Sequence, residues 1–272
     1  LTRGHVIIKL DYASVGIWDA KQRSGEWGAV KPGTILGADG AGTVVAASSD
    51  VTRLRVGERV YSYSYGNPQG GFYAEYVGVS ADRVEHVPDQ LDQRVAGAMP
   101  CVAVTAHAGL RALKIKRGKT LLVFGATGGV GSFVVWLGAQ VEGATIIGTA
   151  RPDAVDYLRA LGGRAADDSS TGFDAVLATA NGDALAGLVA RARANAPLAY
   201  PNGVEPEPKV AGHPSVTFDG EMSREAFELL NAAIGKRAIP LHVEEFPLDR
   251  VVDAHQRIEQ GHVEGKIVLR LT

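Results

Sequence analysis

The chain has 272 residues, of which 46% are hydrophobic and 21% are charged, and its formal net charge is −2. These values are ordinary for a soluble globular protein with one large domain or two, and they give no reason to expect binding to nucleic acid or to a membrane surface. No apolar run approaches the ~20 residues that would span a bilayer. The single cysteine, Cys101, excludes an internal disulfide, removes most zinc chemistry and favours a reducing compartment, so the cytoplasm is the expected location.

The first ninety residues or so read as a β-rich region. Short β-branched or aromatic runs are separated there by Gly, Pro, Asn and Asp, and helical spacing is nearly absent. The runs are VIIKL, GTVVAAS, ERVYSYS and FYAEYVGV.

From about residue 98 the pattern changes to strands that alternate with helices. Strands are expected at 120–124, 145–149, 174–178, 197–201 and 215–220, and helices at 130–141, from Asp153 to the stop at Gly162, over 182–195, and around Phe227, Leu230 and Ile234. This alternation predicts a parallel, doubly wound sheet. The last stretch holds one more helix and the closing strand GKIVLRLT, which we expect to return to the first region. The predicted domains are therefore 1–97 with 240–272, and 98–239.

The stretch GATGGVG, residues 125–131, lies between a predicted strand and a predicted helix. A dinucleotide-binding loop needs small residues for a sharp turn, for backbone contact with a pyrophosphate and for close helix packing, and Ala126, Gly128 and Gly131 fit these three places. A second strand follows, which is the context that such a motif requires. The alternative is a turn with only a structural role.

The second strand indicates which dinucleotide is bound. An NAD site places Asp or Glu at the end of this strand, but here Ala150 stands at that position and Arg151 follows it. A guanidinium can bind a 2′-phosphate, which a carboxylate would repel, so NADPH is favoured. The alternative makes Arg151 an ordinary loop residue and Asp153 the helix N-cap.

Short motifs follow one another along nearly the whole chain: ASVGIWDAKQRSG (13–25), ILGADGAGTVV (35–45), VGERVY (56–61), GGFYAEYVGV (70–79), AGAMPCVAVTAHAGL (96–110), GATGGVGS (125–132) and GKIVL (265–269). In this order they resemble the zinc-free quinone oxidoreductases (zeta-crystallin-like) of the medium-chain dehydrogenase/reductase superfamily. The resemblance implies an α/β fold, with a GroES-like β-rich catalytic domain beside a Rossmann domain and the nicotinamide in the cleft between them. It also implies hydride transfer from NADPH to quinones or to α,β-unsaturated carbonyl compounds.

The resemblance and the loop pattern together give a set of expected cofactor contacts: Thr105, Ala126, Thr127, Gly128, Gly129, Val130, Gly131, Thr149, Ala150, Arg151, Tyr200, Pro201, Asn202, Gly265 and Lys266. Two alternatives stay open within this set. Thr105 could be a helix-interior hydroxyl that bonds its own backbone, and Lys266 could be a surface residue.

The sequence departs from the family pattern in several places. Gly16 and Ile17 stand where the family usually has an Asn near the nicotinamide. Gly16, Ile17 and Trp18 cannot hold the zinc of the zinc-dependent relatives, and Asp39 and His107 lack a plausible set of partner ligands, so no metal is expected. The chain also begins later than family members do, and the connection at 166–174 is short; either feature could be natural or could reflect residues missing from the chain.

Without a metal, conjugate addition of hydride fits the chemistry better than alcohol oxidation. The expected donors to a developing oxyanion are Tyr65 and Asn67, although tyrosines of a β-rich domain often only pack with the hydroxyl at the rim. Cys101 is expected to be a buried structural thiol.

We therefore expect an NADPH-dependent quinone or enone oxidoreductase, with a small-molecule substrate and a homodimeric assembly. A trans-2-enoyl thioester reductase is the nearest alternative, although its longer substrate would need a basic entrance that the sequence does not clearly provide. A protein that binds NADPH as a structural or sensing ligand without turnover is the other.

Overall fold

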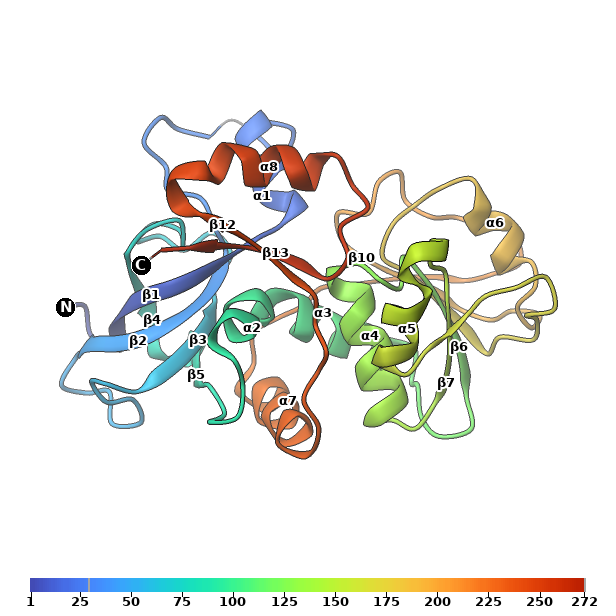
Figure 1. Ribbon diagram of the computed structural model, residues 1–272, viewed down its shortest axis with the longest axis horizontal. Helices are drawn as coiled ribbons and strands as arrows, with labels where there is room; N and C mark the ends of the chain where they lie inside the picture. The colour runs from blue at the N-terminus through green and yellow to red at the C-terminus, as the bar shows by residue number, and fades with distance from the viewer. Residues whose placement is uncertain (29, 272) are drawn as a thin grey trace. The chain divides into compact units, whose positions relative to one another are not determined.

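The computed structural model describes residues 1–28 and 30–271. They form two compact units, one made of residues 1–101 and 222–272 and the other of residues 102–221 (Figure 1). The first unit is therefore built from two separate stretches of the chain, and the second is inserted between them.

The first unit contains a seven-stranded sheet. Its strands are β1 (His5–Val15), β2 (Asp39–Ala47), β3 (Arg59–Tyr63), β4 (Tyr76–Ser80), β5 (Val84–His86), β12 (Val243–Pro247) and β13 (Lys266–Arg270). The order is β12-β13-β1-β2-β3-β5, with β4 paired to β1. β12 and β13 are parallel, whereas β1 pairs antiparallel with β13, β2 and β4. The closing strand thus returns to the first strand of the chain, as expected.

The core of this sheet follows from the period-two pattern of its longest strand. Val6, Ile8 and Leu10 of β1 are each at most 1% exposed, because alternate side chains of a strand point to the same face. They share one apolar cluster with residues of β2, β3, β4 and β13 and with Ala254 of α8 (Val251–Glu259). The amphipathic helix α8 thus contributes to the same core.

The β-rich region also contains a helix, α1 (Ile17–Ser24). The N-cap of this helix is Gly16, whose backbone is extended. The Gly16 N–H donates to the carboxyl of Asp19 at 2.8 Å, as in a capping box. Gly25, with φ of 81°, ends the helix in the left-handed conformation. The expectation of almost no helix in this region is wrong here, because the helix has only eight residues and too few apolar positions to reveal its period.

Helix α7 (Arg224–Lys236) belongs with the first unit. Its Phe227 ring packs against the Tyr61 ring of β3 with centroids 4.7 Å apart, and the Tyr61 hydroxyl donates to Asn231 at 2.6 Å. Asn231 in turn donates to the carbonyl of His86. These contacts join α7 to β3 and β5, whereas the sequence places the domain boundary after this helix.

The second unit contains a parallel sheet of six strands: β6 (Thr120–Phe124), β7 (Thr145–Gly148), β8 (Arg164–Ala165), β9 (Ala175–Ala178), β10 (Leu198–Pro201) and β11 (Ser215–Phe218). The order is β11-β10-β9-β6-β7-β8. Counted from β6, this is the 3-2-1-4-5-6 order of the Rossmann fold, whose switch point lies between β6 and β9. The expected doubly wound sheet is confirmed.

Helices cover both faces of this sheet. On one face lie α3 (Pro100–Ala112) and α4 (Gly129–Gln140), and α4 also contacts α5 (Val155–Leu161). On the other face α6 (Ala184–Val189) buries Leu185 and Val189 in a cluster with β6, β7, β9 and β10. The helix expected over 182–195 is therefore shorter than predicted, because the chain turns after Val189 and reaches Asn195 with φ of 60°.

None of the helices in residues 1–28 and 30–271 has the length and hydrophobicity of a membrane-spanning segment.

Candidate functional site

The glycine loop follows β6 and opens α4. Gly125 has φ of 79°, which gives the sharp turn out of the strand. A Cβ on Gly131 would lie 2.1 Å from the Gly125 carbonyl oxygen, and any residue other than glycine would therefore clash with it. Gly131 is thus required for the first turn of the helix to approach the loop.

Gly128 differs from its neighbours in the loop. It is the N-cap of α4, with an ordinary φ of −78°, and a Cβ there would meet only the Gly125 carbonyl oxygen at 3.6 Å. Neither backbone conformation nor packing within the protein requires glycine at this place. No side chain caps the helix, so the N–H groups of its first turn can face an anion, and the bare Gly128 leaves room for one. The loop fits the pyrophosphate of a dinucleotide.

Two threonines fix the carboxyl edge of the sheet around this loop. Thr149, directly after β7, accepts a hydrogen bond from the Gly125 N–H at 2.9 Å. Thr179, directly after β9, donates to the carbonyl oxygens of Phe124 and Gly125, each at 3.1 Å. The sequence analysis includes Thr149 among the expected contacts but misses Thr179. Thr179 follows a predicted strand at the switch point, and this position indicates a residue near the ligand.

The expected phosphate-binding residue lies next to the loop edge. Arg151 pairs with Asp153 at 3.3 Å, and both side chains are substantially exposed. Asp153 lies in the short 3₁₀ turn Pro152–Ala154 and caps neither this turn nor α5 with its side chain. The alternative that makes Asp153 a helix N-cap is therefore wrong.

The remaining predicted contacts in the second unit differ in accessibility. The Tyr200 side chain is 3% exposed and belongs to the apolar core, so this side chain is not accessible to a ligand. Pro201 ends β10, and the exposed Asn202 donates to Asp219 at 2.5 Å. Thr105 of α3 is buried and packs beside Gly220. A Cβ on Gly220 would lie 2.2 Å from the Thr105 hydroxyl.

In the first unit, the two expected donors have different environments. Tyr65 follows β3 and is 49% exposed. The amide nitrogen of Asn67 donates to the carbonyl oxygens of Gly70 and Gly78 at 2.7 and 2.9 Å. Asn67 therefore fixes its own loop, and of these two residues Tyr65 is the accessible donor.

Lys266 is buried, at 4% exposure, and the alternative that makes it a surface residue is wrong. Its ammonium donates to the Val15 carbonyl at 2.9 Å and lies 4.9 Å from the centre of the Trp18 ring. The preceding Gly265 has φ of 68°, and a Cβ there would lie 2.0 Å from the His242 carbonyl oxygen. The end of the chain is thus held in place by the first unit itself.

Two buried carboxyls accompany this lysine. Asp39, fully buried, accepts a hydrogen bond from the Cys101 N–H at 2.9 Å; burial raises its pKa to about 6, against the opposing effect of the Lys266 charge. Burial likewise raises the pKa of Asp19 to about 7, and the Gly16 N–H opposes this shift. The sequence did not identify Asp19, because its burial depends on the unexpected helix α1.

The Cys101 thiol lies in the same buried surroundings as Asp39, and burial raises the pKa of this thiol above its ordinary value. Within residues 1–28 and 30–271, no three His, Cys, Asp or Glu side chains are grouped closely enough to hold a metal ion. The buried charge facing Asp39 is the Lys266 ammonium.

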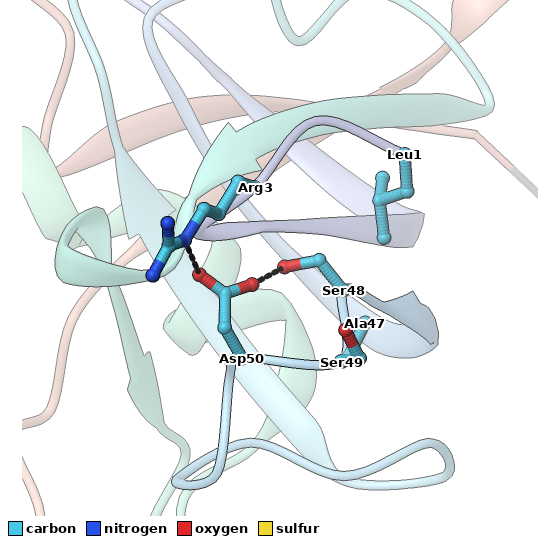
Figure 2. Close-up of a pocket in the computed structure, with 6 residues that line it drawn as sticks. All are labelled: Leu1, Arg3, Ala47, Ser48, Ser49 and Asp50. Carbon is cyan, nitrogen blue, oxygen red and sulfur yellow. Dashed lines mark hydrogen bonds and ion pairs between the residues drawn. The ribbon is translucent and has the colours of Figure 1, made fainter.

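A surface pocket of the first unit lies apart from all of these residues. It is lined by Leu1, Arg3, Ala47, Ser48, Ser49 and Asp50. Figure 2 shows Arg3 and Ser48 directed at the Asp50 carboxylate, at 3.2 and 2.6 Å. These hydrogen bonds lower the pKa of Asp50, the one from Ser48 most strongly. The carboxylate is thus satisfied within the pocket, which contains none of the predicted site residues.

Comparison with known proteins gives two family matches. The model of the alcohol dehydrogenase GroES-like domain matches residues 2–89, and the model described as zinc-binding dehydrogenase matches residues 146–269. The chain is also similar to the quinone oxidoreductase of Coxiella burnetii, with a TM-score of 0.86, 24% identity and coverage of 99% of this chain and 91% of that one.

Two curated relatives extend the likeness to sequence. The 2-methylene-furan-3-one reductase of Solanum lycopersicum is 30% identical over 280 residues, which covers 97% of this chain and 71% of that protein. The chloroplastic NADPH-dependent alkenal/one oxidoreductase of Arabidopsis thaliana is 30% identical over 288 residues, with the same coverage. The chain therefore belongs to the medium-chain dehydrogenase/reductase superfamily, in the same family as these two reductases.

Proposed function

We propose that this protein is an NADPH-dependent reductase that transfers hydride to quinones or to the β-carbon of α,β-unsaturated carbonyl compounds. The observation that carries this proposal is the match over 97% of the chain to relatives named as a furanone reductase and as an alkenal/one oxidoreductase. Both names describe reduction of an activated C=C bond. This also favours a small carbonyl substrate over an enoyl thioester.

The glycine loop supports the cofactor assignment. Gly128 and the N–H groups at the start of α4 would hold the pyrophosphate, and Arg151 would hold the 2′-phosphate after release from Asp153. The dihydronicotinamide supplies hydride when the cofactor is bound. Thr149 and Thr179 keep the loop in its binding geometry through their hydrogen bonds to Gly125.

We assign the donor role in the first unit to Tyr65. Its half-exposed hydroxyl can donate to the oxygen that becomes negative as hydride adds to the conjugated bond. Asn67 is assigned a supporting role, because its amide holds the loop that follows Tyr65. Lys266 and Gly265 are assigned to fixing the start of α1 through the Val15 carbonyl.

We further propose that the reaction needs no zinc. The Lys266 charge already faces Asp39, and among the described residues no three His, Cys, Asp or Glu side chains lie close enough together to hold a metal ion. Elemental analysis of the purified protein is expected to show less than one zinc per chain. Exhaustive dialysis against a chelator should then leave the NADPH-dependent rate unchanged. Loss of the rate on dialysis, restored by added zinc, would contradict this proposal.

The activity is tested by the loss of NADPH absorbance with p-benzoquinone and with but-3-en-2-one. We expect oxidation of NADPH with at least one of these substrates, and identification of the saturated ketone or the hydroquinone as product. Tight binding of NADPH without turnover across a panel of quinones, enones and enoyl thioesters would instead support a protein that only binds the cofactor.

The phosphate contact has its own test. Replacing Arg151 by Ala is expected to weaken NADPH binding on the order of tenfold or more, because a charge-assisted contact contributes roughly 1.5–3 kcal/mol. NADH binding should change little. Arg159→Ala removes another exposed arginine, which pairs with Asp156 on α5, and it serves as the control for net charge. Equal losses for NADPH and NADH would remove the argument for phosphate recognition.

We also propose a cytoplasmic homodimer. The single cysteine fits a reducing compartment, and the likeness to the quinone oxidoreductases favours two subunits. Light scattering coupled to size exclusion would show twice the mass of one chain, and a mass of one chain would contradict the dimer.

A further inference from the structure

The second unit has a surface pocket that the proposed cofactor site does not use. The glycine loop follows the carboxyl end of β6, whereas this pocket lies beside the connection that leads into the amino end of the same strand. Its volume of about 330 Å³ is within the range of small-molecule sites. The residues that line it come from the end of α3, from the α3–β6 connection and from the turn after α4: Leu110, Arg111, Lys114, Ile115, Lys116 and Glu142.

The pocket combines an apolar base with a charged rim. Leu110 and Ile115 are 3% and 5% exposed, so they contribute a small apolar surface at its base. The exposed side chains of Arg111, Lys114 and Lys116 bring positive charge to the rim, whereas the half-buried Glu142 brings one negative charge. An organic anion, charged at one end and apolar at the other, matches this distribution.

Much of the positive charge has no partner within the protein. In the part of the chain that the structure describes, the side chains of Lys114, Lys116 and Arg117 form no hydrogen bond and no ion pair. Arg117 lies next to the pocket, because a Cβ on Gly143 would be 3.3 Å from the central carbon of its guanidinium, and Gly143 directly follows Glu142. These cations are therefore available to a ligand.

The charge at the end of the same run is neutralised instead. The run RALKIKRGK (111–119) contains five cations and no acid. Its last cation, Lys119, pairs with Asp174 at 3.3 Å, and Arg193 pairs with the same carboxylate at 3.0 Å. The unpaired charges of this run thus gather at the pocket.

The backbone at Lys114 makes lysine an unusual residue for this position. Lys114 has φ of 51° just after the end of α3, where the Ile115 N–H donates to the Leu110 carbonyl. Gly25 and Gly162 end α1 and α5 in the same left-handed conformation, with φ of 81° and 101°. A side chain raises the energy of this conformation relative to glycine. Lysine at this position therefore indicates a role for its ammonium group.

The helix ends beside the pocket account for only part of the positive charge. Both α3 and α4 end there, and the free carbonyls of a helix C-terminus carry roughly half a negative charge. Two such ends and Glu142 offset about two of the four cations Arg111, Lys114, Lys116 and Arg117. An excess of about two positive charges remains, which matches the charge of a phosphate monoester near neutral pH.

We propose that this pocket binds a small organic phosphate. Lys114, Lys116 and Arg117 hold the phosphate through charge-assisted contacts, and the apolar part of the ligand covers Leu110 and Ile115. The net charge of −2 and the enclosed shape favour a small anion over a nucleic acid. The ligand is not the cofactor, because the glycine loop lies at the other end of β6, and the proposal does not depend on the proposed function.

Amide NMR spectra of the full chain test this proposal with phenyl phosphate, which carries a phosphate dianion on an apolar ring. We expect saturable shifts at residues 110–117 and 142–143, and a weaker affinity in about 0.5 M salt than in about 0.05 M salt. Inorganic phosphate should bind more weakly, because it cannot cover the apolar base. The absence of saturable shifts, shifts confined to residues 125–131, or equal affinities for the two probes would contradict an organic phosphate site.

Three variants change the charge of the pocket in known directions. Lys114→Gly removes an ammonium group and suits the left-handed backbone, so we expect stability to urea to be kept or raised and the affinity for phenyl phosphate to fall roughly fivefold. Lys116→Ala should lower the affinity by a similar factor. Glu142→Gln should raise the affinity, because it removes the acid that lines the pocket.

Lys9→Ala is the matched control, because Lys9 is an exposed lysine on β1 of the first unit and its loss changes the net charge equally. It should leave the affinity unchanged. An equal loss in Lys9→Ala, or an unchanged affinity in Lys114→Gly, would overturn the proposal. Shifts at the same residues with a DNA duplex but not with phenyl phosphate would assign this surface to a polymer instead, and would overturn the proposal as well.

Discussion

Gly128 and Gly131 stand three residues apart in one loop but meet different surroundings. A Cβ on Gly131 would lie 2.1 Å from the Gly125 carbonyl, whereas one on Gly128 would lie at an ordinary 3.6 Å. Gly131→Ala is therefore expected to cost about 1–3 kcal/mol in the free energy of unfolding, as overpacked positions do. Gly128→Ala should change stability by less than ~0.5 kcal/mol and yet weaken NADPH binding.

Urea unfolding and a cofactor titration of both variants separate the two roles. If Gly128→Ala unfolds as readily as Gly131→Ala, the loop is a packing feature at both positions. If Gly128→Ala binds NADPH with the affinity of the wild type, the pyrophosphate does not approach this residue.

Among the elements, α7 is joined to the strands of the first unit through hydrogen bonds of Asn231. The Tyr61 hydroxyl, on a fully buried side chain, donates to Asn231, which also donates to the His86 carbonyl. Asn231→Ala leaves both partners unsatisfied, so we expect a loss of about 1–3 kcal/mol in the free energy of unfolding. Tyr61→Phe removes only the hydroxyl, and the double variant should be less unstable than the sum of the two single variants. Strict additivity in this cycle would show that the bond does not hold the helix.

Long elements with a clear period were the predictable ones. The strands β6, β7, β9, β10 and β11 and the helix α4 follow from their apolar pattern and from the glycines that separate them, whereas the two-residue strand β8 was not predicted. Helix α1 was missed because its stability comes from a capping contact between Gly16 and Asp19 and from a glycine stop, rather than from an apolar face. The position of α7 depends on Asn231 and Tyr61, which are 170 residues apart, and no local pattern reports such a pair.

The same distinction applies to the site. The loop and Thr149 were recognisable because the motif and the strand end are local features of the sequence. The burial of Asp19, Asp39 and Lys266 was not, because it arises where α1, β2 and β13 come together. Thr179 lies between these cases, since only its position at a strand end identifies it.

For the molecule as a whole, these buried carboxyls predict an unusual dependence of stability on pH. The pKa of Asp19 is about 7 in the folded protein and has the ordinary value of 3.8 in the unfolded chain, so between these values the folded state binds more protons. Its contribution to stability is complete below pH 3.8 and is lost as pH rises toward 7. Because one pKa unit corresponds to about 1.4 kcal/mol, the full effect amounts to a few kcal/mol.

Asp19→Asn removes this contribution. Urea unfolding of wild type and variant at pH 5, 6, 7 and 8 should show the variant gaining stability relative to the wild type at each step. The pKa of Asp50 is lowered instead, so the contribution of Asp50 to stability is lost as pH falls rather than as it rises. This contribution is the same in both proteins and cancels in the difference between their free energies of unfolding. A constant difference across this range would mean that Asp19 titrates alike in both states.

The place of β13, between β12 and β1, has a consequence for the order of folding during synthesis. All residues of the second unit have been made once residue 221 leaves the ribosome, whereas two neighbouring strands of the first unit, β12 at 243–247 and β13 at 266–270, are made afterwards. The strands that are translated first must therefore wait with an open edge at β1 while a complete domain forms behind them. That interval is when chaperones would have most to protect.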